Sequence, residues 1–459
     1  MVSTTGGMHC MDQITSFLKE LKRLGIADAW LVGGVVRDWV RKRPSSDVDI
    51  VCSESNPEIV ASKIHGAIVG KPPQQIVTKR MKEHLVEIIP MRGMCIEDDL
   101  RHRDFTINAM AADINGEIID PFGGVRDIES NTLRLVPAPV LPYEDDPVRV
   151  LRLLRFASFL GYTIEEETRE RTVDFIKNNS DRIRAIPKER LGKEFINGFA
   201  HKPFDFLKLI EDYNLLPLIL PEVEALRGVE QSPIHHPEGD VLAHTFLTLR
   251  EAQSVIRQND DQNSDIVLGL AALLHDIGKP ASACIHPKLD RISFFGHESA
   301  GMHIANKMIT PWAMSEEIRV SVLHLINHHM QPSQTFTERT AVKLIRRIGA
   351  ENAKLLFVLA LCDARGSSGE VCSIVGARAI FEGVMDNLVR AESVQQSKSQ
   401  RLLNGNEVME IMNLKPGPGI AQILEDLDVA TGCGTLQTKE DALLWLKAYS
   451  ADVSLKTTG

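Results

Sequence analysis

The sequence predicts an α+β head followed by a long all-α remainder. Before about residue 140, short apolar runs are separated by glycine, proline and other turn residues, which indicates short strands joined by tight connections. From Val148 onwards, proline and glycine become sparser and helical patterns dominate almost to the end. A chain of 459 residues also exceeds what one hydrophobic core usually organises, so we expect two to four domains.

The composition indicates a soluble globular protein, with 43% hydrophobic and 25% charged residues. No run of about 18 apolar residues appears, and Met1 to Gly7 carry no signal pattern, so we expect a cytoplasmic protein. Seven cysteines occur singly without a CxxC pair, which fits reduced thiols and argues against a zinc finger. The net charge of −10 argues against general nucleic-acid binding, so any such surface must be local.

The first expected element is an amphipathic helix from Met11 to Gly25, because its apolar residues recur at helical spacing. Pro57 to Ile64 has the pattern of a second helix. Short apolar runs predict three strands nearby, at Ala67 to Val69, Gln75 to Val77 and Leu85 to Ile89. Together these elements predict a small α+β domain.

The stretch LVGGVVRDWVRKRPSSDVDIVC, from Leu31 to Cys52, carries the first chemical motif. A strand, a Gly-Gly turn and a basic helix start with Arg37 precede a second strand that holds Asp47 and Asp49. Alternate strand residues share a face, so the two carboxylates can bind one divalent cation, while the turn and Arg37 can contact phosphate oxygens. Each feature alone also fits an ordinary turn or a solvated strand end, but their combined order favours phosphoryl transfer.

Two further stretches carry cations that suit phosphates. In EDDLRHRDFTINAM, from Glu97 to Met110, Arg103 lies where it can meet triphosphate or sugar oxygens, although a charged helix start without function has the same pattern. In EDDPVRVLRLLRF, Asp146 is a candidate N-cap, and the arginines that follow recur every third residue. A solvated basic face is the alternative there. Asp146 and Arg149 lie one turn apart and can hydrogen-bond the edge of a base.

Five segments resemble, in order, the motifs of class II tRNA nucleotidyltransferases, the CCA-adding enzymes and their bacterial poly(A) polymerase relatives: LVGGVVRD with DVD, RHRDFTINAMA, DPFGGVRDI, DDPVRVLRLLRF and RIRAIPKERLGKEF. The resemblance covers the first half of the chain and implies a palm-like sheet followed by a helical neck, body and tail. It implies that Asp47 and Asp49 bind catalytic Mg²⁺ and that Asp146 and Arg149 recognise the incoming cytosine or adenine. It also implies nucleotide contacts for Gly34, Arg37, Arg103, Arg152 and Arg155.

The sequence departs from this family most clearly in one loop. Complete CCA-adding relatives carry a long flexible loop before the acidic pair, whereas only PMRGMCI, from Pro90 to Ile96, stands here. A short loop resembles the CC-adding members, which leave the terminal adenosine to a separate A-adding enzyme. We therefore expect CC addition from CTP to tRNA, with full CCA addition from CTP and ATP as the alternative. Poly(A) polymerase is disfavoured because no basic-aromatic RRF segment follows the second strand.

Two milder departures stand at Asp145-Asp146, where the family usually has Glu-Asp, and at His102-Arg103-Asp104, where it usually has Arg-Arg-Asp. In the expected reaction, the primer 3′-hydroxyl attacks the α-phosphate in line and pyrophosphate leaves. Glu87, on a neighbouring strand, is a further candidate for binding metal or activating the hydroxyl.

A second site is predicted on apolar helices in the other half of the chain. An ordered H…HD…D series is typical of a divalent-metal site that hydrolyses phosphoesters, and comprises His244, His275, Asp276 and Asp363. A lone histidine on such a helix is more often a core residue, but the complete series resembles the HD phosphohydrolase superfamily over residues 235–370. One bacterial subgroup of nucleotidyltransferases carries such a domain and hydrolyses phosphomonoesters or 2′,3′-cyclic phosphates. Residues that can hold a second metal there are His297, His328 and His329.

These features predict four domains: a nucleotidyltransferase head at 1–138, a helical neck and body for base recognition and RNA binding at 139–230, an HD domain at 231–395, and a helical tail at 396–459. The expected cofactors are Mg²⁺ in the head and a second divalent metal in the HD domain. A rival interpretation is an HD phosphohydrolase or phosphodiesterase whose head senses nucleotides. A non-enzymatic RNA-binding module has no need of the D-x-D pair beside the glycine turn.

Overall fold

The computed structural model describes residues 16–456, except residues 27, 46, 73–74, 82–83, 234–235, 257–260, 286–291, 368–370, 395–400, 413 and 415. The chain divides into two compact units. Unit 1 comprises Met1–Glu194 and Leu209–Ile219, and unit 2 comprises Phe195–Lys208 and Leu220–Gly459. The finer division into four domains stays a prediction.

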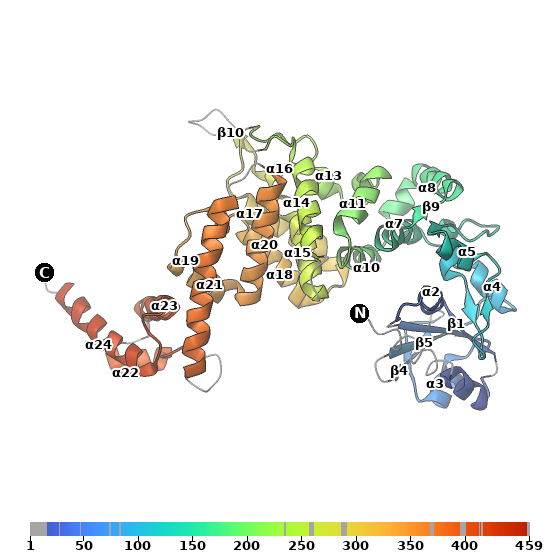
Figure 1. Ribbon diagram of the computed structural model, residues 1–459, viewed down its shortest axis with the longest axis horizontal. Coiled ribbons are helices and arrows are strands. Elements are labelled where there is room, and N and C mark those ends of the chain that lie inside the picture. The colour runs from blue at the N-terminus through green and yellow to red at the C-terminus, as the bar shows by residue number, and fades with distance from the viewer. Residues whose placement is uncertain are drawn as a thin grey trace. The chain divides into compact units, whose positions relative to one another are not determined.

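Unit 1 contains a mixed sheet whose strands, as far as the chain is described, follow the order β3-β4-β5-β2-β1-β6-β7 (Figure 1). The pair β2 and β5 is parallel, and the remaining neighbours are antiparallel. The strands are β1 (Ala29–Val32), β2 (Asp47–Cys52), β3 (Ala67–Val69), β4 (Ile76–Met81), β5 (His84–Pro90), β6 (Ala111–Ala112) and β7 (Ile118–Ile119). The predicted α+β head is confirmed.

Local sequence signals explain the helices of the head well. Helix α3 has the predicted bounds, because the Asn56 side chain accepts a hydrogen bond from the N–H of Glu58 and Pro57 occupies the first turn. The first helix covers residues 16–23, while residues 11–15 of the predicted span lie outside the described residues. The short helices that follow it in the head are α2 (Gly34–Val40), α3 (Pro57–Ile64), α4 (Ile96–Arg101), η1 (Thr106–Asn108) and α5 (Gly124–Glu129).

Helix α7 (Val148–Leu160) has Pro147 as its N-cap and not Asp146 as predicted, although Asp146 Oδ1 accepts a hydrogen bond from the N–H of Val148. Four apolar residues of this helix are fully buried: Val150, Leu151, Leu153 and Leu154. Strands β8 (Thr132–Leu133) and β9 (Thr163–Ile164) form a short parallel pair nearby. The neighbouring helices are α6 (Pro142–Asp145), α8 (Glu166–Asn178), α9 (Ser180–Arg184), α10 (Lys188–Phe199), α11 (Pro203–Asp212) and α12 (Leu216–Ile219).

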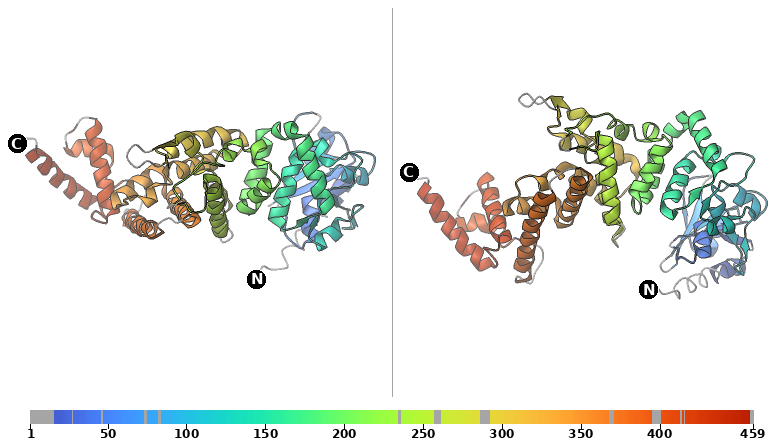
Figure 2. Two further views of the ribbon diagram at one scale, coloured as in Figure 1. Left: turned by 90° about the horizontal axis from the view of Figure 1, so that it is seen from above. Right: turned by 45° about the horizontal axis from the view of Figure 1, so that its top comes forward.

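Unit 2 is mainly helical. Helix α14 packs against α15 and α20, and α15 packs against α18, so these helices form a bundle that is visible in two further views (Figure 2). Its elements are α13 (Pro221–Glu224), α14 (Val241–Ile256), α15 (Gln262–Leu274), α16 (Lys279–Ser282), β10 (Cys284–Ile285), β11 (Ile292–Ser293), α17 (His297–Ile309), η2 (Thr310–Trp312), α18 (Glu316–His328), η3 (Gln331–Ser333), α19 (Glu338–Ile348), α20 (Ala350–Gly366), α21 (Val371–Val394), α22 (Gly405–Met412), α23 (Pro418–Gly432) and α24 (Lys439–Lys456). None of the described helices is long and apolar enough to cross a membrane.

Candidate active sites

The turn between β1 and α2 brings predicted site residues of the head together. Gly33 has φ 72° and ψ −131°, a backbone conformation that residues with a Cβ rarely adopt. A Cβ at this position would lie 3.0 Å from Arg103 Nη1 and 3.5 Å from Asp49 Oδ2. The Arg103 guanidinium and the Asp49 carboxylate therefore both approach the backbone of the glycine turn, as a phosphate-binding loop beside a metal ligand requires.

Strand β2 holds the predicted carboxylates at alternating positions. Val48 and Ile50 are fully buried, and Asp49 between them lies on the opposite face of the strand. In the parallel register, Asp49 pairs with Glu87 of β5, so Glu87 neighbours the predicted metal site. The backbone of Asp47 belongs to β2, but its side chain lies outside the described residues. Carboxylates are the donors that Mg²⁺ prefers, so the described part of this site fits the ion.

A chain of polar contacts runs behind the turn. Arg37 Nη1 donates to Asn108 Oδ1 at 2.9 Å, and Asn108 Nδ2 donates to Asp104 Oδ1 at 3.0 Å. Asp104 Oδ2 in turn pairs with Arg152 Nη2 at 3.1 Å. Although burial opposes ionisation of Asp104, the Arg152 charge and the Asn108 hydrogen bond together lower the pKa of this carboxyl. The predicted residues Arg37 and Arg152 are thus linked by Asn108 and Asp104, for which no role was predicted.

Arg37 and Arg155 also share one aromatic side chain. Their guanidinium carbons lie 5.2 Å and 4.5 Å from the centre of the Phe156 ring. Arg155 Nε donates to Glu194 Oε2 at 2.6 Å. The alternative of a solvated basic face on α7 is therefore wrong, because the arginines are anchored by carboxylates and an aromatic ring. The contacts of these arginines with nucleotide phosphates stay a prediction. The nucleotide contact of Gly34 also stays a prediction; a Cβ at Gly34 would lie 3.6 Å from Arg37 Nη2, so the backbone there is close to this arginine.

The predicted base-reading pair is tied to other parts of unit 1. The Arg149 guanidinium is buried and donates to two backbone carbonyls, to Pro142 O at 3.1 Å and to His102 O at 2.8 Å. The Asp146 carboxylate forms a forked ion pair with Arg190 of α10, with Nη1 to Oδ1 at 2.9 Å. Sequence reasoning missed Arg190, although it stands in the quoted segment RIRAIPKERLGKEF.

In unit 2, the H…HD…D series converges in space as predicted. His244 Nε2 lies 2.8 Å from Asp363 Oδ1 and 3.4 Å from His275 Nε2, and His275 Nε2 lies 3.1 Å from Asp276 Oδ2. The residues come from α14, the end of α15 and α20, and three of them are almost fully buried. Two imidazoles and two carboxylates around one point are a donor set that suits a divalent transition metal.

The histidines are oriented by hydrogen bonds at the far ring nitrogen. His244 Nδ1 lies 2.9 Å from Glu238 Oε1, which also binds His236 Nδ1 at 2.8 Å. The Nδ1 atoms of the other rings each contact the carbonyl three residues earlier, at 2.8–3.0 Å, in His275, His297 and His329. Each ring thus directs Nε2 at the cluster, the arrangement that metal-binding histidines use. Glu238, which holds both rings, was not predicted from the sequence.

Asp276 also belongs to a second group of donors. Its Oδ1 atom lies 3.5 Å from His297 Nε2 and 3.8 Å from His329 Nε2, and the two imidazoles are 3.1 Å apart. These three residues can hold a metal ion beside the first one, with Asp276 facing both positions. His328 does not join them, because its Nδ1 atom hydrogen-bonds Gln331 at 3.0 Å.

Burial and neighbouring charges shift the protonation of these groups in opposite directions. Burial disfavours the charged form of His244, but the hydrogen bonds with Asp363 and Glu238 raise its pKa to about 10. Burial lowers the pKa of His329 to about 4. Despite the burial of Asp276 and Asp363, their histidine neighbours hold both carboxyl pKa values below the usual range. The carboxylates are therefore ionised and His329 is neutral, as metal binding requires, whereas His244 is protonated and must release a proton before its Nε2 atom can bind a metal ion.

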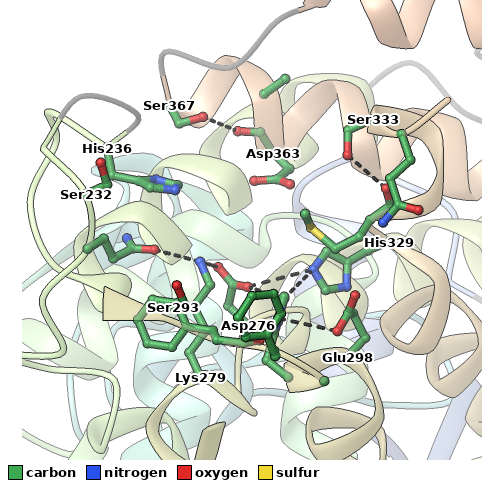
Figure 3. Close-up of a pocket in the computed structure, with 18 of the residues that line it drawn as sticks. Ser232, His236, Asp276, Lys279, Ser293, Glu298, His329, Ser333, Asp363 and Ser367 are labelled. Carbon is green, nitrogen blue, oxygen red and sulfur yellow. Dashed lines mark hydrogen bonds and ion pairs between the residues drawn. The ribbon is translucent and has the colours of Figure 1, made fainter. Parts of the chain in front are cut away.

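A cavity of about 730 Å³ opens onto these groups. Figure 3 shows Asp276, His329 and Asp363 on its walls, with the Lys279 amine beside Asp276. Lys279 Nζ lies 2.7 Å from Asp276 Oδ2 and donates to Gln231 Oε1 at 2.6 Å. Lys279 was not predicted, although it follows the His-Asp pair in HDIGK. The volume of the cavity suits a small phosphoester, and the Lys279 ammonium group can contact the phosphate of that ligand.

Three family models match the chain. The model "Poly A polymerase head domain" matches residues 29–134, and "Probable RNA and SrmB- binding site of polymerase A" matches residues 161–226. The model "HD domain" matches residues 241–365. The chain is also 30% identical over 430 residues to a multifunctional CCA protein of Halorhodospira halophila, which covers 86% of this chain and 97% of the relative.

Other similar proteins differ in their stated activity. An A-adding tRNA nucleotidyltransferase of Deinococcus radiodurans is 28% identical over 433 residues, which is 92% of this chain and 96% of the relative. Among solved structures, the CCA-adding enzyme of Bacillus stearothermophilus in complex with CTP matches with a TM-score of 0.65 at 21% identity, covering 97% of this chain and 98% of that one. The Thermotoga maritima CCA-adding enzyme complexed with tRNA matches with a TM-score of 0.59 at 19% identity, covering 95% of each chain. These two structures establish a shared fold.

Proposed function

The chain belongs to the CCA-adding tRNA nucleotidyltransferases, and we propose that it adds two cytidylates from CTP to the 3′ end of tRNA and then stops. The family assignment rests on the relatives and family models above. The stop after two cytidylates rests on one observation, the short connection between β5 and α4.

The site residues of unit 1 have separate tasks in the proposed reaction. Mg²⁺ bound at Asp47 and Asp49 would stabilise the charge that develops on the α-phosphate and on the attacking 3′-hydroxyl. Arg103, which already lies beside Asp49 and the glycine turn, would bind triphosphate oxygens. Asp146 and Arg149 would read the base in place of a nucleic-acid template. Arg152 and Arg155 would hold the phosphates or keep their neighbours in place.

The connection between β5 and α4 is short and held at several points. Its residues are 91–95, and Met91 N donates to Cys52 O at 2.8 Å. Met94 N donates to Asp98 Oδ2 at 2.9 Å. At Gly93, with φ 89°, a Cβ would lie 2.4 Å from the Cβ of Asp98, so the loop packs directly on α4. This connection is short and packs on α4, unlike a long mobile arm that could help to change base recognition from cytosine to adenine, which supports the proposed stop.

The proposal is tested with three purified tRNA substrates that end before the first C, after one C, and after both. Each is incubated with labelled CTP, with labelled ATP, or with both nucleotides. We expect CTP to extend the first two substrates to CC, and ATP to extend none of the three. In a cell, a separate A-adding enzyme would then complete the end. Extension to CCA by the protein alone would contradict the proposal.

Full CCA addition is the nearest alternative, because several similar proteins carry the name multifunctional CCA protein. Addition of A alone is a further outcome, since one relative is named an A-adding enzyme. The same three substrates separate all these activities. Incorporation of ATP into the CC-ending tRNA, with no use of CTP, would assign the chain to the A-adding type.

The second candidate activity is metal-dependent phosphoester hydrolysis in unit 2, and the converging H…HD…D donors beside the 730 Å³ cavity favour it. Lys279 and the histidine rings would orient the substrate phosphate, and a divalent ion would activate the attacking water. We expect Mn²⁺- or Ni²⁺-loaded protein to hydrolyse p-nitrophenyl phosphate or 2′,3′-cyclic AMP. Asp276→Asn should abolish this hydrolysis and leave CTP incorporation unchanged.

The reciprocal variant separates the two sites. In Asp47→Ala combined with Asp49→Ala, CTP incorporation should vanish while phosphoester hydrolysis survives. Loss of both activities would contradict independent sites, provided that the variant melts at the same temperature as the parent protein. Hydrolysis without any CTP incorporation by the parent protein would favour the rival interpretation of a nucleotide-sensing head.

A further inference from the structure

Three arginines hold the segment that leads into α7. Arg149 Nη1 donates to Pro142 O at 3.1 Å, and Arg182 pairs with the Glu144 carboxylate and donates to Glu144 O at 2.6 Å. Arg190 forms the forked ion pair with Asp146. Arg182 belongs to α9 and Arg190 to α10. These two helices therefore hold the segment that carries Asp146, the residue proposed to recognise the base.

The contact with Arg190 determines how the Asp146 carboxylate is oriented. Both carboxylate oxygens accept from Arg190, and Oδ1 also accepts from Val148 N at 3.2 Å. A planar guanidinium fork binds a carboxylate in one plane, and this restricts rotation of the carboxylate. The side chains of Asp146 and Arg190 are 21% and 50% exposed, so solvent and ligand can reach the pair.

The orientation of this carboxylate matters because bases differ at their hydrogen-bonding edge. Cytosine and adenine carry an amino group there, whereas uracil and guanine carry a carbonyl oxygen. A carboxylate accepts from an amino group and repels a carbonyl oxygen. A carboxylate held in one plane can accept from the amino group in every binding event and so discriminates fully between the bases. A carboxylate that rotates is correctly oriented only part of the time, so its discrimination is weaker.

We propose that Arg190 is a positioning residue for base selection, which fixes Asp146 so that it accepts from the amino group of the incoming base. The proposal rests on the proposed nucleotidyl transfer. Arg190 touches neither the reacting phosphate nor the primer hydroxyl in this scheme. Its removal should therefore weaken base binding and discrimination more than the chemical step.

The test compares Arg190→Gln with Arg190→Lys and with the control Arg184→Gln. Arg184 lies on α9, is largely exposed and pairs with Asp181 of its own helix. For Arg190→Gln, we expect the KM for CTP to rise about tenfold, kcat to fall less than threefold, and the preference for CTP over UTP to drop about tenfold, the loss of roughly one good hydrogen bond. Lysine, a cation without the fork, should restore part of the preference.

The control should match the parent protein in every constant. An unchanged KM and an unchanged preference for CTP over UTP in Arg190→Gln would overturn the proposal. A fall in kcat alone would also overturn it, since that result indicates a general structural role. If Arg190→Gln melts early, the same comparison is made with Arg190→Lys, whose preference for CTP must lie below that of the parent.

A second variant pair tests whether Arg190 acts through Asp146. In the background Asp146→Asn, adding Arg190→Gln should cause little further loss of preference, because the carboxylate that Arg190 orients is already absent. Additive losses would contradict the proposed route. Absence of any CTP incorporation by the parent protein would instead refute the proposed function itself, so the two failures are distinguishable.

Discussion

Gly33 is the residue of the head where backbone conformation and site geometry depend most directly on each other. Its positive φ is unfavourable for any residue with a Cβ, and the added atom would crowd Arg103 Nη1 at 3.0 Å. We predict that Gly33→Ala lowers the rate of CTP incorporation at least tenfold and costs about 1–2 kcal/mol of stability. Initial rates and thermal melting measure the two effects.

The matched control is Gly376→Ala in α21, where a Cβ would meet nothing within 4 Å. This variant should keep the parent rate and be at least as stable, because alanine favours helix. Full activity of Gly33→Ala would show that the turn tolerates a side chain and that its close approach to Arg103 is unimportant.

Asp104 gives a prediction that depends on pH. Burial opposes its charge, but Arg152 and Asn108 lower its pKa, so the carboxylate stabilises the fold above its unfolded pKa of about 3.9. That contribution is lost as pH falls toward the folded pKa. We predict that Asp104→Asn costs about 1–3 kcal/mol at pH 7 and that the difference from the parent shrinks below about pH 4.

Chemical denaturation at pH 7, 4 and 3 checks this dependence. The exposed ion-pair variant Asp181→Asn serves as control and should change stability by less than about 0.5 kcal/mol at each pH. A stability difference for Asp104→Asn that stays constant from pH 7 down to pH 3 would contradict the assigned protonation.

The sequence identifies residue types at these sites better than it identifies their partners. The four HD residues could be predicted because a short series with fixed order carries a strong chemical signal. The Arg190 contact with Asp146 could not, since 44 residues separate them and no local pattern records the pairing. His328 and His329 are adjacent, and the sequence does not show which of them faces Asp276. The backbone conformation at the end of α18 directs the His329 ring toward Asp276 and the His328 ring toward Gln331.

At the scale of elements, the HD site depends on how closely α17 approaches the loop after α15. A Cβ at Gly278 would lie 2.1 Å from His297 O and 2.5 Å from Gly301 N, both of α17. We predict that Gly278→Ala pushes α17 outward, moves His297 away from Asp276 and lowers metal content at this site several-fold. Phosphoester hydrolysis should fall, and CTP incorporation should remain.

Metal content by elemental analysis and the two activity assays measure these outcomes. Gly376→Ala again provides the control, with parent values throughout. If Gly278→Ala kept both its metal and its hydrolysis, the close contact with α17 would have no part in shaping the site.

The predicted elements agree best where local signals are complete. Helix α3 has an N-cap and a proline in its first turn, and its bounds are as predicted. Strand β4 was predicted as Gln75 to Val77 but runs from Ile76 to Met81, because pairing with β5 extends it through polar residues. The order of strands in the sheet depends on contacts between distant segments, and no local pattern supplies it.

For the whole molecule, the α+β head and helical remainder were predictable because strand and helix periodicities differ throughout their length. The family resemblance supplied the remaining architecture, and the relatives and family models confirm it. The bounds of the two compact units were not predicted. Residues 195–208 belong to unit 2, whereas the next residues, 209–219, belong to unit 1. This alternation depends on how the helices pack, and no local sequence pattern records it.

The two units and the separate donor clusters predict uncoupled responses to metal. We expect calorimetry to show two unfolding transitions. MnCl₂ should raise the midpoint temperature of the transition of unit 2, which contains the HD site. At 100 times its dissociation constant, a ligand adds about 2.7 kcal/mol to the stability of the unit it binds. Asp276→Asn should remove this shift. A single unfolding transition in the parent protein would contradict the prediction. Equal shifts of both transitions by MnCl₂ in Asp276→Asn would contradict it as well.

The position of Asp276 between two groups of donors has a consequence for the history of this half of the chain. Its two oxygens face separate imidazole groups, so one codon change would disable both candidate ion positions at once. The apolar bundle around it would remain intact, since Asp276 lies beyond the end of α15 and contributes no apolar surface. Loss of hydrolysis would thus be a single mutational step that leaves a folded scaffold for other uses, and only selection for the activity would preserve the complete donor set over many generations.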